Sequence, residues 1–228
     1  QMKYHLLKAQ AKKKKFLQKK KKQEVLDDSD GSLSSDDEES YSEDMIGKLI
    51  NEKYIIIKYL GKGTYSKVWC VLDIIDNRYL ALKIQDDTYL DDINNEINIL
   101  KTLSKGVNLD NKDDIYENKF SLMYDNFDIK MNGKLYKCIL FELLGESLEY
   151  LFYEENDDII SLELFKKVIY DILYGLNQIH KKGIVHTDLK LDNILIKQVN
   201  DELKQYLVEI EKLNISEYYN NLLTNSFP

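Results

Sequence analysis

The most distinct hydrophobic pattern in the chain is typical of β-strands. The runs YIIIKYLG (54–61), SKVWCVLDII (66–75) and RYLALKI (78–84) are rich in β-branched and aromatic residues. A short glycine turn separates the first two runs, and Asp76 and Asn77 form a turn-like pair before the third. The pattern predicts three strands joined as a meander.

A helical period follows these strands. In DDINNEINILKTL (91–103), Ile93, Ile97 and Leu100 fall on one face of a helix. The polar stretch from 104 to 118 is interpreted as a loop, because it has no apolar period.

A hairpin is predicted next. The runs FSLMYDNFDIKM (120–131) and KLYKCILFELL (134–144) are separated by Asn132 and Gly133, a pair that suits a tight turn. Later, NILIK (193–197) is interpreted as a brief strand.

The longest predicted helix begins after Ser161, a good N-cap, and ends at Gly183, a good helix stop. Its apolar stripe consists of Leu164, Val168, Ile172, Leu176 and Ile179. Near the end of the chain, residues 200–227 are also helix-prone.

Composition separates a tail from this folded part. Residues 1–44 hold a lysine stretch, KAQAKKKKFLQKKKK, and then an acidic serine-rich stretch, DDSDGSLSSDDEESYSED. Such blocks are normally solvated and disordered, because they cannot supply a packed core. The alternatives for the lysines are a nuclear-import or nucleic-acid-binding patch, and the serines suit phosphorylation.

Length and charge limit the class of protein. The 228 residues, 43% of them hydrophobic, suffice for one domain with a tail. A net charge of −8 argues against nucleic-acid binding except through the lysine-rich tail. No apolar run reaches the length of a membrane span, so no membrane partner is expected. Cys70 and Cys138 lie in apolar runs that are far apart in the sequence, which predicts reduced, buried thiols. We therefore expect the protein in the cytoplasm or nucleus, which includes those of a host cell infected by a virus.

Two features suggest phosphate chemistry. GKGTYSKV (61–68) lies between strands, where glycines let the backbone approach phosphates, although by itself a glycine turn between strands is more often only a hairpin turn. The strand context excludes a P-loop or a dinucleotide fold, since both need a helix directly after the glycines. Glu96 lies on the apolar face of the predicted helix and needs a cationic partner. We expect Lys83, on the third strand, to pair with it, with Asp92 as the weaker alternative carboxylate.

The octet HTDLKLDN (186–193) concentrates polar groups between the apolar segments GIVH and ILI, which we expect to be buried. A glycine turn, a strand lysine, a helix glutamate and this octet, in that order, resemble the signature of eukaryotic-type serine/threonine protein kinases. The chain is most similar to the kinases of serine/arginine-rich proteins. GKGTYSKVW, with Ser66 in place of the usual third glycine, FELLGESL (141–148) and HTD in place of His-Arg-Asp suggest this.

The resemblance covers about residues 45–197 and implies an α+β, protein-kinase-like fold. It implies a five-stranded antiparallel small lobe and the first, helical part of a large lobe. The implied division is a disordered tail (1–44), the small lobe and hinge (45–145), the start of the large lobe with the catalytic loop (146–197), and a helix-prone segment that is a candidate start of a spacer insert (198–228).

The same resemblance implies the site residues, with ATP and Mg²⁺ as cofactors. The backbone of Gly61, Lys62, Gly63, Thr64, Tyr65 and Ser66 would cover the phosphates, which Lys83 and Glu96 would orient. Around the adenine would lie Val68 and Ala81 above the ring, Leu195 below it, the backbone of Glu142 and Leu144 at its edge, and Phe141 behind the pocket. Asp188 would accept the proton of the substrate hydroxyl, Lys190 would steady the γ-phosphate, and Asn193 would hold magnesium.

Substrates would be protein serines or threonines, with Arg-Ser repeats among the candidates. In most kinases an arginine at the place of Thr187 binds a phosphate on the activation loop, and threonine cannot. The resemblance therefore implies that activity does not need activation-loop phosphorylation.

One expected motif does not occur in the 228 residues. No glycine follows Gly183, and Asp201 is the only aspartate after Asp192, so there is no Asp-Phe-Gly segment. Either residues 198–228 begin a spacer, with the rest of the lobe on another stretch of gene or polypeptide, or the chain is a truncated, inactive kinase-like protein that binds nucleotide or a partner. In both cases we expect poor magnesium binding and a partly exposed stripe on the long helix.

Overall fold

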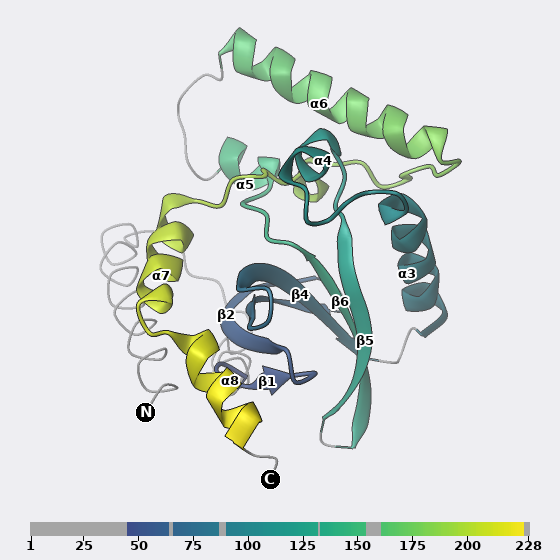
Figure 1. Cartoon of the computed structure of the whole chain (residues 1–228). Helices are drawn as coiled ribbons and strands as arrows, with labels where there is room; N and C mark the ends of the chain where they lie inside the picture. The colour runs from purple at the N-terminus through teal and green to yellow at the C-terminus, as the bar shows by residue number, and fades with distance from the viewer. Residues whose placement is uncertain (1–44, 64–65, 87–89, 132, 154–160, 226–228) are drawn as a thin grey trace, which may run out of the picture. The chain divides into compact units, whose positions relative to one another are not determined.

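The structure is a computed structural model that describes residues 45–63, 66–86, 90–131, 133–153 and 161–225. The predicted tail, residues 1–44, and Thr64 and Tyr65 lie outside these described residues. The elements are β1 (Leu49–Ile50), β2 (Tyr54–Lys62), β3 (Ser66–Asp73), β4 (Arg78–Asp86), α3 (Leu90–Ser104), α4 (Lys112–Glu117), β5 (Met123–Met131), β6 (Lys134–Glu142), α5 (Leu148–Tyr153), α6 (Leu162–Lys181), the 3-10 helix η2 (Leu191–Asn193), α7 (Asp201–Glu211) and α8 (Ile215–Asn225) (Figure 1).

The sheet has the strand order β1-β2-β3-β4-β6-β5. It contains the predicted meander and hairpin, and the two-residue strand β1 adds a sixth strand to the five expected. The chain divides into two compact units, and the boundary passes through β2, β3 and β4. The first unit takes its described residues from 1–61, 69–79 and 202–228, and the second from 62–68 and 80–201.

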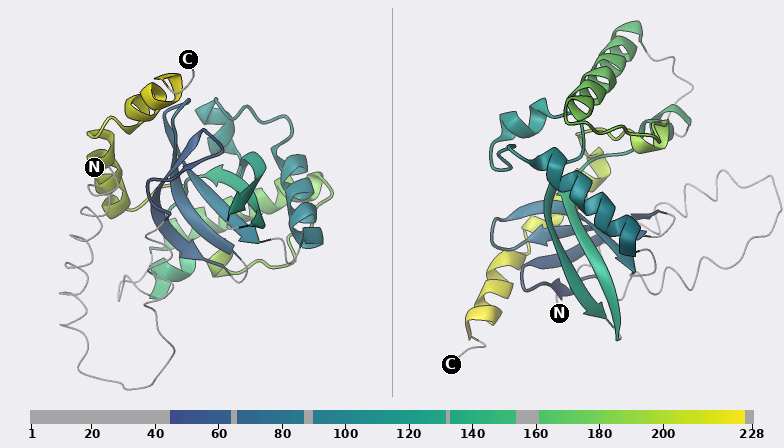
Figure 2. Two further views of the ribbon diagram at one scale, coloured as in Figure 1. Left: turned by 90° about the horizontal axis from the view of Figure 1, so that it is seen from below. Right: turned by 90° about the vertical axis from the view of Figure 1, so that its right-hand side faces the viewer.

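In the second unit, β4, β6 and β5 form antiparallel pairs, with Lys83 opposite Ile139 on β6. The β5–β6 hairpin turns at Gly133, whose φ of 80° lies in the left-handed region that glycine adopts easily. Helix α3 lies beside this hairpin in both views of Figure 2. Its predicted apolar face, with Ile93 and Ile97, packs against Met123 and Ile139, and this cluster forms the core of the unit.

The prediction of a loop over residues 104–118 is wrong in part. Helix α4 occupies Lys112–Glu117. The Asn111 side chain accepts a hydrogen bond from Asp113 N at 2.9 Å, and Asp113 and Asp114 lie in the first turn. Asparagine at the N-cap and aspartates in the first turn both favour a helix start, so the helix is specified by its polar residues rather than by an apolar period.

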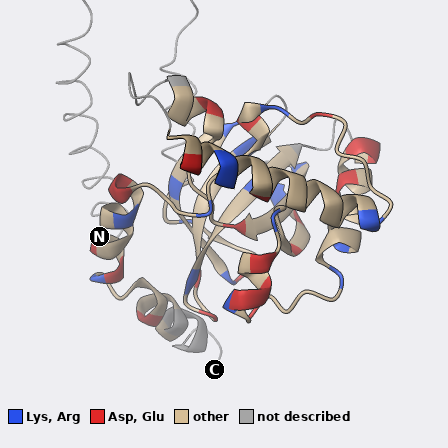
Figure 3. Ribbon diagram, turned by 90° about the horizontal axis from the view of Figure 1, so that it is seen from above, with Lys and Arg blue, Asp and Glu red and all other residues tan. Residues whose placement is uncertain are grey.

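Helix α6 begins and ends as predicted. The Ser161 hydroxyl accepts a hydrogen bond from Leu164 N at 3.2 Å, and Gly183 has a φ of 74° just beyond the last turn. The stripe is covered at one end only, since Ile179 is 5% exposed and Leu164 is 51% exposed. The other half-exposed or exposed apolar side chains of the helix are Leu162, Phe165, Ile169, Tyr170, Leu173 and Tyr174. Figure 3 shows most of the helix without charge.

The predicted brief strand at 193–197 is wrong as an extended element. Only one bridge forms there among the described residues, between Ser147 and Leu195. The 3-10 helix η2 (Leu191–Asn193) includes Asn193, the first residue of the predicted strand, so few residues remain for an extended strand.

In the first unit, α7 and α8 pack on the strands, which confirms that the segment after 200 is helical. The Tyr206 hydroxyl donates to the Ile57 carbonyl oxygen at 3.2 Å, and the Tyr219 hydroxyl donates to the Gly47 carbonyl oxygen at 2.6 Å. Apolar side chains of these helices complete the core, and Leu207 and Ile210 are 8% and 1% exposed. Two distant stretches of sequence therefore share one core.

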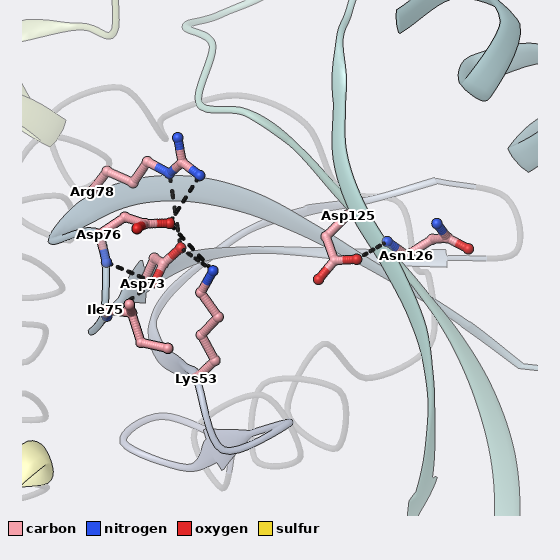
Figure 4. A network of polar contacts seen from close by, with 7 residues as sticks. All are labelled: Lys53, Asp73, Ile75, Asp76, Arg78, Asp125 and Asn126. Atoms are coloured by element: carbon pink, nitrogen blue, oxygen red, sulfur yellow. Dashed lines mark hydrogen bonds and ion pairs between the residues drawn. The ribbon is translucent and has the colours of Figure 1, made fainter. Parts of the chain in front are cut away.

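A cluster of charges fixes the turn between β3 and β4 (Figure 4). Asp73 is buried and accepts backbone hydrogen bonds from Ile75 N and Asp76 N, at 3.1 and 3.2 Å. The Lys53 ammonium lies 3.1 Å from Asp73 Oδ2, and Arg78 Nη2 donates to Asp76 Oδ2 at 3.1 Å. The hydrogen bond from Lys53 holds the pKa of Asp76 below its ordinary value. The cluster places two cations beside a buried carboxylate, whose charge would otherwise be uncompensated.

The cysteine prediction is confirmed for the residues described. Cys70 and Cys138 are free and buried. Burial raises the pKa of each thiol to about 12. No helix in the described ranges is long and apolar enough to cross a membrane.

Candidate active site

The glycine turn lies between β2 and β3, as the sequence predicts. Strand β2 continues through Gly61 and Lys62, and Gly63 N donates to the Ser66 carbonyl oxygen at 2.9 Å, which closes the turn. A Cβ atom added at Gly63 would lie 3.0 Å from Ser66 Oγ, whereas one at Gly61 would meet nothing within 4 Å. The turn is therefore closely packed where Gly63 meets Ser66, whereas the space beside the Gly61 backbone is free of other atoms of the described residues.

The predicted ion pair between Lys83 and Glu96 is confirmed. The Lys83 ammonium lies 2.7 Å from Glu96 Oε1 and 2.9 Å from Oε2, so it contacts both carboxylate oxygens. Strand β4 carries the lysine and α3 carries the glutamate, one turn before the buried Leu100. The side chains are 22% and 35% exposed, so the pair is only partly shielded from water. The alternative partner, Asp92, is exposed.

The predicted adenine residues come from the strands beside this pair. Ala81 on β4 lies opposite Phe141 on β6, and Phe141 packs against the cluster formed by α3, β5 and β6. Val68 lies on β3, and Leu144 follows the end of β6; both are half-buried. Glu142, the last residue of β6, lies opposite Leu80, and its side chain is 12% exposed.

The catalytic-loop residues Asp188 and Asn193 contact each other. Asn193 Nδ2 donates to the Asp188 backbone carbonyl oxygen and to Asp188 Oδ2, both at 2.9 Å. The helix η2 brings Asn193 back, with its backbone N–H donating to the Lys190 carbonyl oxygen at 3.0 Å. The Lys190 ammonium lies 3.6 Å from Asp188 Oδ2 and 4.0 Å from Asp192. The three predicted catalytic and metal residues thus form one cluster.

The expected burial of the flanking segments is wrong. Val185 is 71% exposed and Leu195 is 45% exposed. The other apolar residues of the flanks are only half-buried, namely Ile184, Ile194 and Ile196. Short-range hydrogen bonds fix the loop instead, including Asp188 N to the His186 carbonyl oxygen at 2.8 Å. Within the described part of the chain, the apolar residues of the flanks are therefore only partly covered.

Thr187 has an unusual backbone. Its φ is 60°, in the left-handed region. That region is unfavourable for a β-branched residue, and such strain is concentrated at functional sites. This conformation could not be predicted from the sequence, because threonine is not a residue that marks a positive φ.

The side chains of the site fit the phosphates of ATP and a magnesium ion, the two groups that the resemblance implies, to different degrees. A lysine ammonium held by a carboxylate can bind phosphate oxygens. Because the Asn193 amide nitrogen faces Asp188, its amide oxygen remains to bind magnesium, which prefers oxygen ligands. Within the described residues, no group of three or more His, Cys, Asp or Glu side chains is placed to hold a metal ion.

Two lysines near the site were missed by sequence reasoning. Lys182, just beyond α6, donates to the carbonyl oxygens of Leu103 and Lys105, at 2.8 and 3.3 Å. Lys197 lies 3.8 Å from Glu142 Oε1. Both contacts join segments more than fifty residues apart, and no local spacing could have indicated them.

The comparisons with known proteins agree with this geometry. Residues 54–211 match the protein kinase domain. The chain is 32% identical to the serine/threonine-protein kinase spk-1 of Caenorhabditis elegans over 177 residues, which cover 75% of this chain and 17% of that protein. It is 30% identical to the putative serine/threonine-protein kinase L205 of Acanthamoeba polyphaga mimivirus, over 81% of this chain and 34% of that protein.

Human SRSF protein kinase 3 is 31% identical over 68% of this chain and 27% of its own length. The chain thus spans between about a sixth and a third of the length of these curated relatives. A crystal structure of a kinase domain superposes with a TM-score of 0.57 at 28% identity, covering 67% of this chain and 42% of that one. By the matched range, the strand order and the relatives together, the chain belongs to the protein kinase family, with serine/threonine kinases among its relatives.

Proposed function

We propose that the chain carries the nucleotide-binding and catalytic-loop part of an ATP-dependent protein serine/threonine kinase, with serines in Arg-Ser-rich proteins as the substrate class. The observation that carries this proposal is the contact of Lys83 with both carboxylate oxygens of Glu96. A lone strand lysine is usually a solvated surface group, whereas a lysine fixed by a carboxylate from a helix is held ready for an anion.

Each residue has a role in this proposal. Lys83 binds the phosphates, and Glu96 keeps its ammonium in place. The turn from Gly61 to Ser66 covers the phosphates with backbone N–H groups. Asp188 accepts the proton of the substrate hydroxyl, and Lys190 balances the negative charge nearby. ATP supplies the phosphoryl group, and Asn193 offers one oxygen ligand to its magnesium ion.

A second candidate is a kinase-like protein without catalysis, which binds nucleotide or a partner. The contact of Lys83 with Glu96 fits this candidate equally well, because an anchored ammonium binds an anion whether or not transfer follows. In this case the Lys83–Glu96 pair can still hold phosphate, while the cluster around Asp188 transfers no phosphoryl group.

The test uses the full 228-residue chain. ATP binding is measured by calorimetry with magnesium, and transfer is measured with labelled ATP and a Ser/Arg-rich peptide. We expect binding that Lys83→Met weakens at least tenfold, while Lys101→Met, an exposed lysine on α3, leaves it unchanged. Transfer that Asp188→Asn abolishes supports the kinase, and binding without transfer supports the second candidate. Lack of ATP binding overturns both.

A further inference from the structure

Two segments about fifty residues apart in the sequence are joined through their backbones. Gly145 N donates to the Ile196 carbonyl oxygen at 2.7 Å, and Ile196 N donates to the Glu146 carbonyl oxygen at 3.0 Å. Leu148 N donates to the Ile194 carbonyl oxygen at 2.8 Å. The first segment, residues 142–148, is called the hinge segment below. Its position is therefore tied to the segment that directly follows the catalytic loop.

Glycine at 145 makes this approach possible. A Cβ atom at Gly145 would lie 2.2 Å from the Gln198 carbonyl oxygen, which is closer than any real contact. At the same place, Asn200 Nδ2 donates to Glu146 Oε1 at 2.6 Å. The approach is thus specific, and a side chain at 197 is held close to the start of the hinge segment.

Lys197 uses this position to contact two further elements. Its ammonium lies 3.8 Å from Glu142 Oε1, at the end of β6, and donates to the carbonyl oxygen of Ile115 in α4. It also lies 5.9 Å from the centre of the Tyr116 ring, within the range of a cation–π contact. One ammonium therefore joins β6, α4 and the segment after the catalytic loop.

Glu142 depends on this partner. Its side chain is 12% exposed, and among the described residues Oε2 has no hydrogen-bond donor. Burial raises the pKa of Glu142, and the nearby Lys197 opposes that rise. Burial likewise lowers the pKa of Lys197, which Glu142 opposes. Each group is poorly solvated, so removing one would leave the other with an uncompensated charge.

The other charges near Lys197 have partners of their own. Lys119 lies 3.6 Å from Asp171 on α6, and its ammonium is 4.3 Å from the centre of the Tyr116 ring. Asp171 attracts Lys197 and Lys119 repels it, so these two influences oppose each other. Glu142 is the carboxylate that lies within ion-pair distance of Lys197.

We infer that Lys197 is a positioning residue for nucleotide binding, which sets the hinge segment against the segment that carries Leu195. This inference rests on the proposed function, in which the backbone of Glu142 and Leu144 meets the adenine edge and Leu195 lies below the ring. Lys197 touches no reacting atom. It acts through Glu142, and so its effect falls on recognition of the base rather than of the phosphates.

The test compares two ligands on the full chain. Lys197→Met keeps the length of the side chain and removes its charge. We expect it to weaken ATP binding about tenfold and to leave inorganic tripolyphosphate binding unchanged, because only ATP has a base. Glu142→Gln should produce a similar loss for ATP, and Lys197→Arg should restore most of the affinity. Lys130→Met, an exposed lysine on β5, is the matched control.

A second measurement does not depend on nucleotide. Hydrogen–deuterium exchange of the Gly145 and Leu148 amides should be faster in Lys197→Met than in the wild type or in Lys197→Arg. Wild-type ATP affinity in Lys197→Met, or an equal loss for tripolyphosphate, overturns the inference. If the wild-type chain bound no ATP, the proposed function would fail, whereas unchanged exchange in Lys197→Met would count against the positioning role itself. Should Lys197→Met fail to fold, Glu142→Gln carries both measurements.

Discussion

The Lys182 ammonium donates a hydrogen bond to the carbonyl oxygen of Leu103, at 2.8 Å, and thereby binds the C-terminal end of α3. The last carbonyl oxygens of a helix have no partner within the helix, and a cation there also favours the helix dipole. Lys182 directly follows α6 and Glu96 lies on α3. The helix that carries Glu96, the partner of Lys83, is thus fastened at its far end.

Replacing Lys182 should loosen that end of α3. We expect Lys182→Met to reduce the free energy of unfolding by about 1 kcal/mol and Lys182→Arg to reduce it much less, because arginine can still donate. Urea denaturation followed by circular dichroism measures the change. Lys181→Met, one residue earlier and also exposed, is the control. Equal losses at both positions would contradict a specific cap.

The exposed apolar side chains of α6 that lie outside its stripe should promote self-association. Tyr170 and Leu173 are 65% and 61% exposed, so either can be replaced by lysine without disturbing a packed core. We expect Tyr170→Lys and Leu173→Lys to remain monomeric at protein concentrations where the wild type associates, as measured by light scattering. Asn177→Lys adds the same charge on the helix at an exposed polar position and should have little effect. Association that all three variants reduce equally would indicate a simple effect of net charge.

The contact of α8 with the first unit can be tested with adjacent tyrosines. Tyr219 donates to the Gly47 carbonyl oxygen at 2.6 Å, whereas Tyr218 is 52% exposed. Tyr219→Phe removes one hydroxyl and keeps the ring, and we expect it to lower the free energy of unfolding by about 1 kcal/mol. Tyr218→Phe should change it by less than about half of that. Thermal and urea unfolding check both values, and a reversed order would exclude this contact.

The two thiols predict a dependence of stability on alkaline pH. Burial raises the pKa of Cys70 and of Cys138 to about 12 in the folded protein, whereas an unfolded cysteine has a pKa of about 8.5. Above pH 8.5 the unfolded chain loses protons that the folded chain retains. Stability should therefore fall as the pH rises from about 8.5 towards 12, and be unaffected by the thiols below that range.

Urea midpoints measured from pH 7 to 10 test this dependence, and the Cys70→Ala, Cys138→Ala double variant should show a smaller fall. Thiol reagents should modify both cysteines only after denaturation. Rapid modification of the native chain would show that the thiols are accessible.

The sequence predicted the elements that have a strong apolar period or a clear turn. The strands, α3 and α6 follow from spacing, and the Lys83–Glu96 pair follows from a carboxylate on an apolar helix face. Helix α4 was missed because its signals are the N-cap Asn111 and the aspartates behind it, with no apolar stripe.

Other features could not be predicted because they depend on distant segments. Lys197 meets Glu142 only once the hinge segment and the segment after the catalytic loop are joined, and local sequence contains no trace of that. The prediction that the segments beside the catalytic loop are buried was wrong. An apolar residue such as Val185 has a preference for burial, but the sequence does not show whether another element covers it. The left-handed Thr187 likewise reflects constraints from its neighbours rather than its own preference.

The described residues of the first unit come from two distant parts of the sequence, 45–61 with 69–79 and then 202–225, and this division has a consequence for synthesis. During translation, β1 and β2 leave the ribosome long before Leu207 and Ile210, which line the same core. The second unit lies between these two stretches and can pair β4, β6 and β5 earlier. The nascent first unit must therefore wait, with apolar strand surface uncovered, until residues 202–225 emerge, and this interval is where chaperone binding would be most useful.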